Sequence, residues 1–409
     1  MVAKSIFFLF LACSYFPLTI GGFTLFKALG VLLAATTLVS LTRRHSSLVV
    51  TPISTAVTVM FVAGLLGSSR SGLFNIEQLV KMLQNLVLVW IVADRSGSRT
   101  DRRLILGGLG FGAMIVVLDG LLGTGALAAE ERLAGMVANA NGYGQACVQA
   151  LICALGLLDE TRGIRRTVLS ALVVVPCTAG LAYSGSRGAM ISMAAAFLMV
   201  LVFTSAKRAA ALTFASIVTL ASLLTAQTYM QRWDTVLQPA TSKSRSGLEG
   251  RLDVWGPGWQ LFMGSPIVGV GTGNAKDEAG RVLGVARPQV THSVLIQCAT
   301  ELGIVGSMAW LFLLWRTGHS LRWLAKRSRA SMSAARSDTF LLVFFGALLA
   351  GQFFSGNYIH AIWYVLFGIA LRHDWEAATA ARLWARARGN TGPWVRSVPR
   401  LNAVAPRRP

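Results

Sequence analysis

The stretch "LVVVPCTAGLAYSGSRGAMISMAAAFLMVLVF", residues 172–203, consists of two apolar runs joined by the short connection Ser184–Gly188. A helix needs about 20 predominantly apolar residues to cross a hydrocarbon core of about 30 Å. With their flanking residues, the two runs predict spans at about 167–183 and 188–204. The stretch therefore predicts two membrane helices with a tight turn between them.

Apolar runs of this kind recur along the whole 409-residue chain, which is 54% hydrophobic and 13% charged. We expect an all-α integral membrane protein with about twelve transmembrane helices. The expected spans lie at roughly 5–20, 22–41, 48–67, 76–93, 104–122, 142–158, 167–183, 188–204, 209–226, 291–315, 339–355 and 358–371.

The basic residues are distributed unevenly between the two sides of this arrangement. Lys4, the basic connections on one side and the tail after Leu371 together hold 26 of the 38 lysines and arginines. Cytoplasmic segments of membrane proteins are enriched in Lys and Arg, so we expect both termini in the cytoplasm. The net charge of +21 then reflects the basic segments between the apolar runs, so we expect membrane lipids and no nucleic acid among the partners.

This topology divides the chain into two parts. We expect residues 1–371 to form a polytopic membrane domain and residues 372–409 to form a basic cytoplasmic tail. The longest outer loop, residues 227–290 between spans nine and ten, contains "RLDVWGPGWQLFMGSPIVGVGTGN", residues 251–274. Its tryptophans favour short amphipathic helices at the membrane surface, with a break near Pro257 and a glycine-rich turn after them.

Arg187 lies in the connection "SGSRG" on the expected outer side, where the positive-inside bias does not explain a cation. Ser184 and Ser186 offer hydroxyl groups, and the backbone N–H groups at the start of the next helix are free to bind an anion. The connection is therefore a candidate anion site. The alternative is an interfacial turn whose arginine reaches lipid headgroups.

Two more residues of the outer side carry chemistry that suits a reaction. Arg251 can bind a phosphate with two parallel hydrogen bonds, although Asp253 is close enough in sequence to pair with it instead. His292 precedes the tenth span and can take a proton from a hydroxyl group, although a histidine there can also be a polar cap.

Three charged residues within the spans fit structural roles better. Glu301 is expected to be a buried polar contact of the bundle. Glu77 and Lys81 are spaced i,i+4 and are expected to neutralise one another.

Patterns for metal or cofactor binding are missing from the sequence, which contains no HExxH, no histidine cluster and no phosphate-binding P-loop. All five cysteines lie within or beside apolar runs, so no disulfide framework is predicted. We expect neither a metal nor a cofactor, and a reaction would need a substrate that carries its own leaving group.

Three motifs in this order resemble the core of the O-antigen ligase and polymerase superfamily of bacterial envelope glycosyltransferases. They are "YSGSRGAMISMAAAF", "GRLDVWGPGWQLFMGSPIVGVGTGN" and "THSVLIQCATELGIVGSMAWLFLL", and "RLAGMVANANGYG" resembles the family's preceding outer-loop motif. The resemblance covers about residues 130–315. It implies a GT-C-like membrane fold and a metal-independent, inverting transfer from an undecaprenyl-pyrophosphate-linked glycan.

The resemblance also implies roles for individual residues. Arg187 and Arg251 would hold the pyrophosphate, and His292 would act as the base on the acceptor hydroxyl. The further residues expected to line the substrate site are Arg132, Ser186, Asn141 and Trp255.

The leading hypothesis is an O-antigen ligase of the bacterial inner membrane. It would transfer O-antigen polysaccharide to a sugar hydroxyl of lipid A-core at the periplasmic face. An O-antigen or exopolysaccharide polymerase that uses the same donor is the first alternative. A transporter of a lipid-linked glycan is the second, with the outer arginines as a gate.

Overall fold

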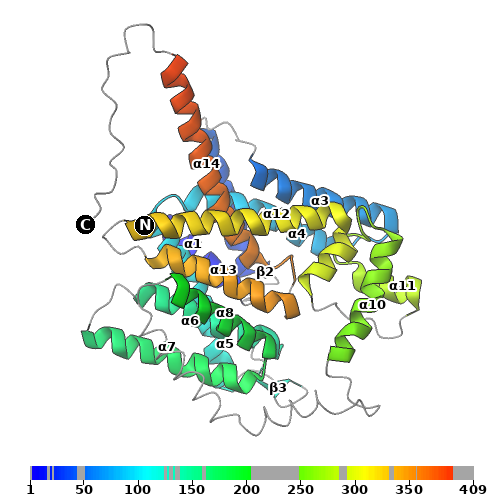
Figure 1. The fold of residues 1–409 in the computed structure, drawn as a ribbon, viewed down its shortest axis with the longest axis horizontal. Helices are drawn as coiled ribbons and strands as arrows, with labels where there is room; N and C mark the ends of the chain where they lie inside the picture. The colour runs from blue at the N-terminus through cyan, green and yellow to red at the C-terminus, as the bar shows by residue number, and fades with distance from the viewer. Residues whose placement is uncertain are drawn as a thin grey trace.

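The computed structural model describes residues 2–15, 19–20, 23–43, 51–123, 127–128, 132–133, 139–158, 163–203, 248–284, 293–330, 336–355 and 357–389. Helices account for most of the described residues (Figure 1). They are α1 (Val2–Ala12), α2 (Leu25–Arg43), α3 (Pro52–Ser71), α4 (Ile76–Arg95), α5 (Arg99–Leu121), α6 (Ala140–Leu158), α7 (Gly163–Ser184), α8 (Arg187–Phe203), α10 (Leu248–Gly264), α11 (Ala275–Leu283), α12 (Val294–Ala330), α13 (Arg336–Ser355) and α14 (Ala361–Gly389). Two antiparallel hairpins of two-residue strands join them: β1 (Thr19–Ile20) with β2 (Phe23–Thr24), and β3 (Leu127–Ala128) with β4 (Arg132–Leu133).

The long helices run back and forth between two ends of the bundle (Figure 1). One end carries the α3–α4, α7–α8 and α10–α11 connections, and we call it the motif end. The opposite end carries the α4–α5 connection and the ion pairs Arg102–Asp338 and Lys4–Asp101, both 2.7 Å long. We call it the basic end.

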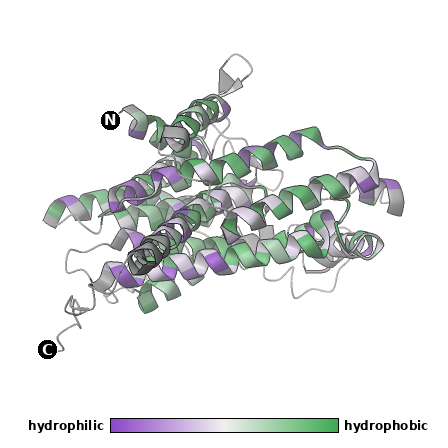
Figure 2. Ribbon diagram, turned by 90° about the horizontal axis from the view of Figure 1, so that it is seen from above, coloured by the Kyte–Doolittle hydropathy of each residue, from purple (hydrophilic) through white to green (hydrophobic). Residues whose placement is uncertain are grey.

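Large apolar side chains cover much of the outer surface of the bundle. Leu172 and Val175 on α7 are 63% and 56% exposed, and Leu198 and Val202 on α8 are 60% and 67% exposed. Hydrophobic residues follow most of the length of the helices (Figure 2). A surface of this kind is stable against lipid and not against water, so the fold is that of a helical membrane protein.

Four described helices are long and apolar enough to cross a membrane by length and composition: α3, α4, α5 and residues 294–328 of α12. Shorter apolar helices include α8 and parts of α1, α2, α7 and α13. The ninth expected span, residues 209–226, lies outside the described residues. The count of twelve spans therefore stays a prediction.

The first expected span, residues 5–20, is wrong in extent. Helix α1 has 11 residues and ends at Ala12, which makes it about 16 Å long and too short to cross a bilayer alone. Thr19 and Ile20, assigned to the span, instead form strand β1. Proline lacks a backbone N–H group, so Pro17 opposes one continuous helix over this range.

The structural roles expected for charged residues within the helices are confirmed. Lys81 and Glu77 form an i,i+4 ion pair of 2.7 Å on α4. Glu301 is 3% exposed and hydrogen-bonded inside the bundle. The five cysteines are free and buried.

Candidate active site

The α7–α8 turn places Arg187 on the surface of the motif end. Gly185 has a φ of 56°, a left-handed conformation that lets the chain reverse directly after α7. The Ser186 hydroxyl accepts a hydrogen bond of 3.2 Å from the N–H of Ala189 and so caps α8. Arg187 is the exposed first residue of α8, where the N-terminal backbone favours an anion nearby.

The two serines of this turn are buried and hold its shape. Ser184 Oγ donates to the carbonyl of Leu181 over 2.7 Å and accepts from the N–H of Ser186 over 3.2 Å. Both side chains are 0% exposed. Ser186, expected to line the substrate site, uses its hydroxyl in this structure to cap the start of α8.

Helix α6 and strand β4 bring two further expected residues to the same region. Helix α8 is bonded to α6, since Ser192 Oγ donates to Gln145 Oε1 over 3.0 Å. Asn141 lies in the first turn of α6, and its backbone N–H donates to Asn139 Oδ1 over 2.9 Å. Arg132 belongs to β4, which contacts α6 and α7. The side chain of Arg132 lies outside the described residues.

Helix α10 carries Arg251 in its first turn and Trp255 one turn later. Trp255 is partly buried, and the side chain of Arg251 lies outside the described residues. The expected break near Pro257 is wrong, because α10 is continuous from Leu248 to Gly264. The helix packs against α12, and Thr300 Oγ1 donates to the carbonyl of Gly258 over 3.0 Å, directly after the proline.

His292 lies outside the described residues. The next residue, Ser293, is 2% exposed and precedes α12. In the sequence, His292 therefore comes two residues before the first residue of α12.

The glycine-rich segment Ser265–Asn274 follows α10 and bonds to a break in α12. Within α12, Gly303 has φ 63° and ψ −164°, which is not helical. The carbonyls of Thr300 and Glu301 accept from the N–H groups of Val270 and Gly271, both over 2.9 Å. In a regular helix these carbonyls would accept from Ile304 and Val305.

The two N–H groups freed by this break are also satisfied by the glycine-rich segment. Ile304 N–H donates to the carbonyl of Pro266 over 2.8 Å, and Val305 N–H donates to that of Ile267 over 3.2 Å. A Cβ atom on Gly303 would lie 2.6 Å from the nitrogen of Val268, so the approach needs glycine. The glycine-rich segment therefore supplies hydrogen-bond partners for the backbone groups of α12 that the break leaves unpaired within the helix.

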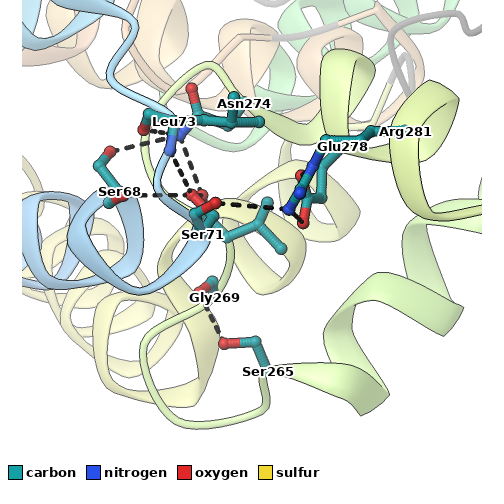
Figure 3. Close-up of polar contacts among 9 residues, drawn as sticks. Ser68, Ser71, Leu73, Ser265, Gly269, Asn274, Glu278 and Arg281 are labelled. Carbon is teal, nitrogen blue, oxygen red and sulfur yellow. Dashed lines mark hydrogen bonds and ion pairs between the residues drawn. The ribbon is translucent and has the colours of Figure 1, made fainter.

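The other side of the glycine-rich segment is fixed to the end of α3 (Figure 3). Asn274 Nδ2 donates to the carbonyls of Leu73 over 2.7 Å and Val270 over 3.0 Å. Ser71 Oγ donates to the carbonyl of Val270 over 2.9 Å. Gly271, with a φ of 95°, lies so close to α3 that a Cβ atom there would be 2.6 Å from Ser68 Cα.

Arg281 on α11 binds Glu278 through two hydrogen bonds of 2.9 Å (Figure 3). These bonds and the charge of the carboxylate raise the pKa of Arg281. The pair joins two successive turns of α11 at the motif end.

Glu301 joins three elements of the motif end. Its Oε2 atom accepts from the N–H of Gly273 and from the Tyr358 hydroxyl, both over 2.8 Å, and its Oε1 atom accepts from Gln297 over 3.3 Å. The sequence indicated a buried polar contact at Glu301 but not its partners. Tyr358 and Gly273 are 57 and 28 residues away along the chain, and no local pattern links them to Glu301.

A protein-family model described as O-antigen ligase matches residues 172–311. The matched segment includes the α7–α8 turn, α10, the glycine-rich segment and the break in α12. It therefore includes Arg187, Arg251 and His292. A comparison with curated proteins finds no match. The family match confirms the resemblance read from the motifs.

Proposed function

We propose that this member of the O-antigen ligase and polymerase superfamily is a membrane glycosyltransferase of the ligase type. It transfers O-antigen polysaccharide from undecaprenyl pyrophosphate to a sugar hydroxyl of lipid A-core. The reaction is inverting, needs no metal and takes place at the periplasmic face of the bacterial inner membrane. The motif end then faces the periplasm, and the basic end and both termini face the cytoplasm.

The exposed position of Arg187 on a rigid turn carries the proposal. Its backbone is held by two buried serines, and the N-terminus of α8 adds a partial positive charge beside it. As the glycosidic bond breaks, the pyrophosphate leaving group gains negative charge. A cation fixed in advance at its oxygens stabilises the transition state more than the ground state.

Arg251 and His292 complete the proposed chemistry. Arg251 supplies a second guanidinium group for the pyrophosphate, since guanidinium stays charged and can bind two oxygens at once. His292 removes the proton of the acceptor hydroxyl as that oxygen attacks the anomeric carbon. Arg132, Asn141 and Trp255 line the substrate site around them.

A polymerase would need the same donor site, so the two activities are separated by their product. The test is deletion of the gene in its native host, followed by gel analysis of lipopolysaccharide and of lipid-linked glycan. The ligase proposal predicts core without O-antigen and an accumulation of long lipid-linked glycan. Core that carries single repeat units would indicate the polymerase instead.

Two further results of the same experiment would contradict both transferase assignments. Unaltered lipopolysaccharide in the deletion strain would contradict a role in O-antigen assembly. Lipid-linked glycan that is found only at the cytoplasmic face would indicate the transporter. Complementation with the wild-type gene is the control, since it should restore the O-antigen ladder.

A further inference from the structure

A polar cavity of about 250 Å³ opens at the motif end, beside the glycine-rich segment. It lies between the start of α4, the start of α11, the first part of α12 and the segment that enters α14. Its polar lining side chains are those of Asn75, Gln78, Lys276, Asp277, Gln297, Glu301 and Asn357. Pockets for drug-sized ligands measure about 300–1,000 Å³, so this cavity suits a single sugar ring.

The lining groups match a polyhydroxylated ring. Four of them are carboxamides, and each carboxamide can both donate to and accept from a hydroxyl group. Among the described residues, the side chains of Gln78, Lys276 and Asp277 form no hydrogen bond or ion pair with one another or with any other residue. These three groups therefore have their bonding capacity available for a ligand.

The charge of the cavity disfavours a pyrophosphate. Lys276 supplies one cation, whereas Asp277 and Glu301 are both acids. Among the described residues, Arg187 does not line the cavity. The cavity is thus distinct from the site proposed at Arg187.

The wall of the cavity is fixed in advance by Glu301. That carboxylate holds Gly273, at the start of α11, and Gln297 on α12. It also accepts from Tyr358, next to the lining residue Asn357. A site whose walls are already held in place loses less entropy when a ligand binds.

The cavity is also close to the residue that follows the proposed base. Gln297 donates its N–H to the carbonyl of Ser293 over 2.9 Å, so the two are one helical turn apart, about 5.4 Å along the axis. Ser293 directly follows His292 in the chain. A sugar in the cavity would therefore lie about one helical turn from the start of α12.

We propose that this cavity binds the acceptor sugar beside the first turns of α12. The inference rests on the proposed function for its reaction, and it adds the residues that select the acceptor. Gln78 and Asp277 are the specificity residues, with Gln297 and Glu301 as the fixed wall.

The test compares Gln78→Leu and Asp277→Asn with wild type in purified protein. Rough lipopolysaccharide from the native host serves as acceptor, and lipid-linked glycan from the same host serves as donor. We expect the KM for acceptor to rise about tenfold in each variant, since one or two hydrogen bonds are lost. The kcat and the KM for donor should stay within about twofold. Lys81→Ala is the control, because Lys81 is one turn from Gln78 on α4 but does not line the cavity.

An unchanged KM for acceptor in both variants would overturn the proposal while leaving the transferase activity in place. A rise in the KM for donor instead would assign the cavity to the donor glycan and would also overturn it. If wild type shows no transfer, the proposed function fails separately. Saturation-transfer NMR with core oligosaccharide then tests whether the cavity binds the acceptor. Binding that is weakened by Gln78→Leu supports the proposal, and no binding to wild type contradicts it.

Discussion

The motif end and the basic end of the bundle use charge in different ways. At the basic end, Arg102 on α5 binds Asp338 on α13 through hydrogen bonds of 2.7 and 2.9 Å, with side-chain exposures of 13% and 4%. At the motif end, Arg187 is exposed on a turn whose own hydrogen bonds come from serine and backbone groups.

This difference separates charges that hold helices together from charges that can meet a substrate. A buried ion pair fixes two helices because neither partner can be lost without leaving an uncompensated charge. At the motif end, the backbone of the glycine-rich segment, the side chain of Asn274 and the buried Glu301 carboxylate join the helices, and Arg187 lies at the surface. Substitution of the ion pair at the basic end should therefore lower stability, whereas substitution of Arg187 at the motif end should lower the transfer rate.

The largest expected effect is on stability at the basic end. Arg102→Ala leaves the Asp338 carboxylate buried without its partner, so we expect a loss of roughly 3–5 kcal/mol in the free energy of unfolding. Thermal unfolding of the protein in detergent measures it. The double variant Arg102→Met with Asp338→Leu should recover most of the loss, since an apolar pair tolerates burial. An unchanged melting temperature in the single variant would show that the pair is not structural.

The next effect is on activity at the motif end. Arg187→Ala should lower the rate of transfer about 10²- to 10³-fold, as for other fixed groups that stabilise developing charge. Its melting temperature should fall less than that of Arg102→Ala, because Arg187 is exposed whereas the Arg102–Asp338 pair is buried. The transfer rate of Arg187→Lys should lie between those of wild type and Arg187→Ala, since lysine keeps the charge without the bidentate geometry. Full activity in Arg187→Ala would remove the proposed donor site.

A smaller effect is expected where the motif end is joined to the core. Tyr358→Phe removes one of the hydrogen bonds to the Glu301 carboxylate, and bonds to charged groups contribute about 1.5–3 kcal/mol. We expect a loss of stability in that range, measured by chemical or thermal unfolding in detergent. Tyr183→Phe is the matched control, because Tyr183 is 51% exposed. Equal stability of the two variants would argue against the role assigned to Glu301.

The smallest effect is expected for Lys81→Ala. The Lys81–Glu77 pair is exposed, with side-chain exposures of 43% and 72%, and exposed i,i+4 pairs contribute little to stability because water screens their charges. Stability and transfer rate should both stay close to wild type. A loss of activity comparable to that of Arg187→Ala would mean that any cation at the motif end matters, and the comparison of the two ends would fail.

The sequence predicted most helices and the α7–α8 turn because their causes are local. The length of an apolar run can be compared directly with the thickness of a bilayer. Serine and glycine in "SGSRG" favour a capped turn whatever surrounds them. The i,i+4 spacing of Glu77 and Lys81 likewise predicts their ion pair from one helix alone.

Sequence alone therefore determined the class of fold, the order of its motifs and the candidate residues Arg187, Arg251 and His292. Only the tertiary structure decided that α10 continues through Pro257, that α1 ends at Ala12, and that the glycine-rich segment bonds to a break in α12. The physical reason is that these features depend on groups far apart in the chain. Asn274 and Leu73, for example, are joined by one hydrogen bond across 201 residues. Hydrophobicity and spacing describe neighbours along the chain, whereas the partner of a buried polar group is set by which helices pack together.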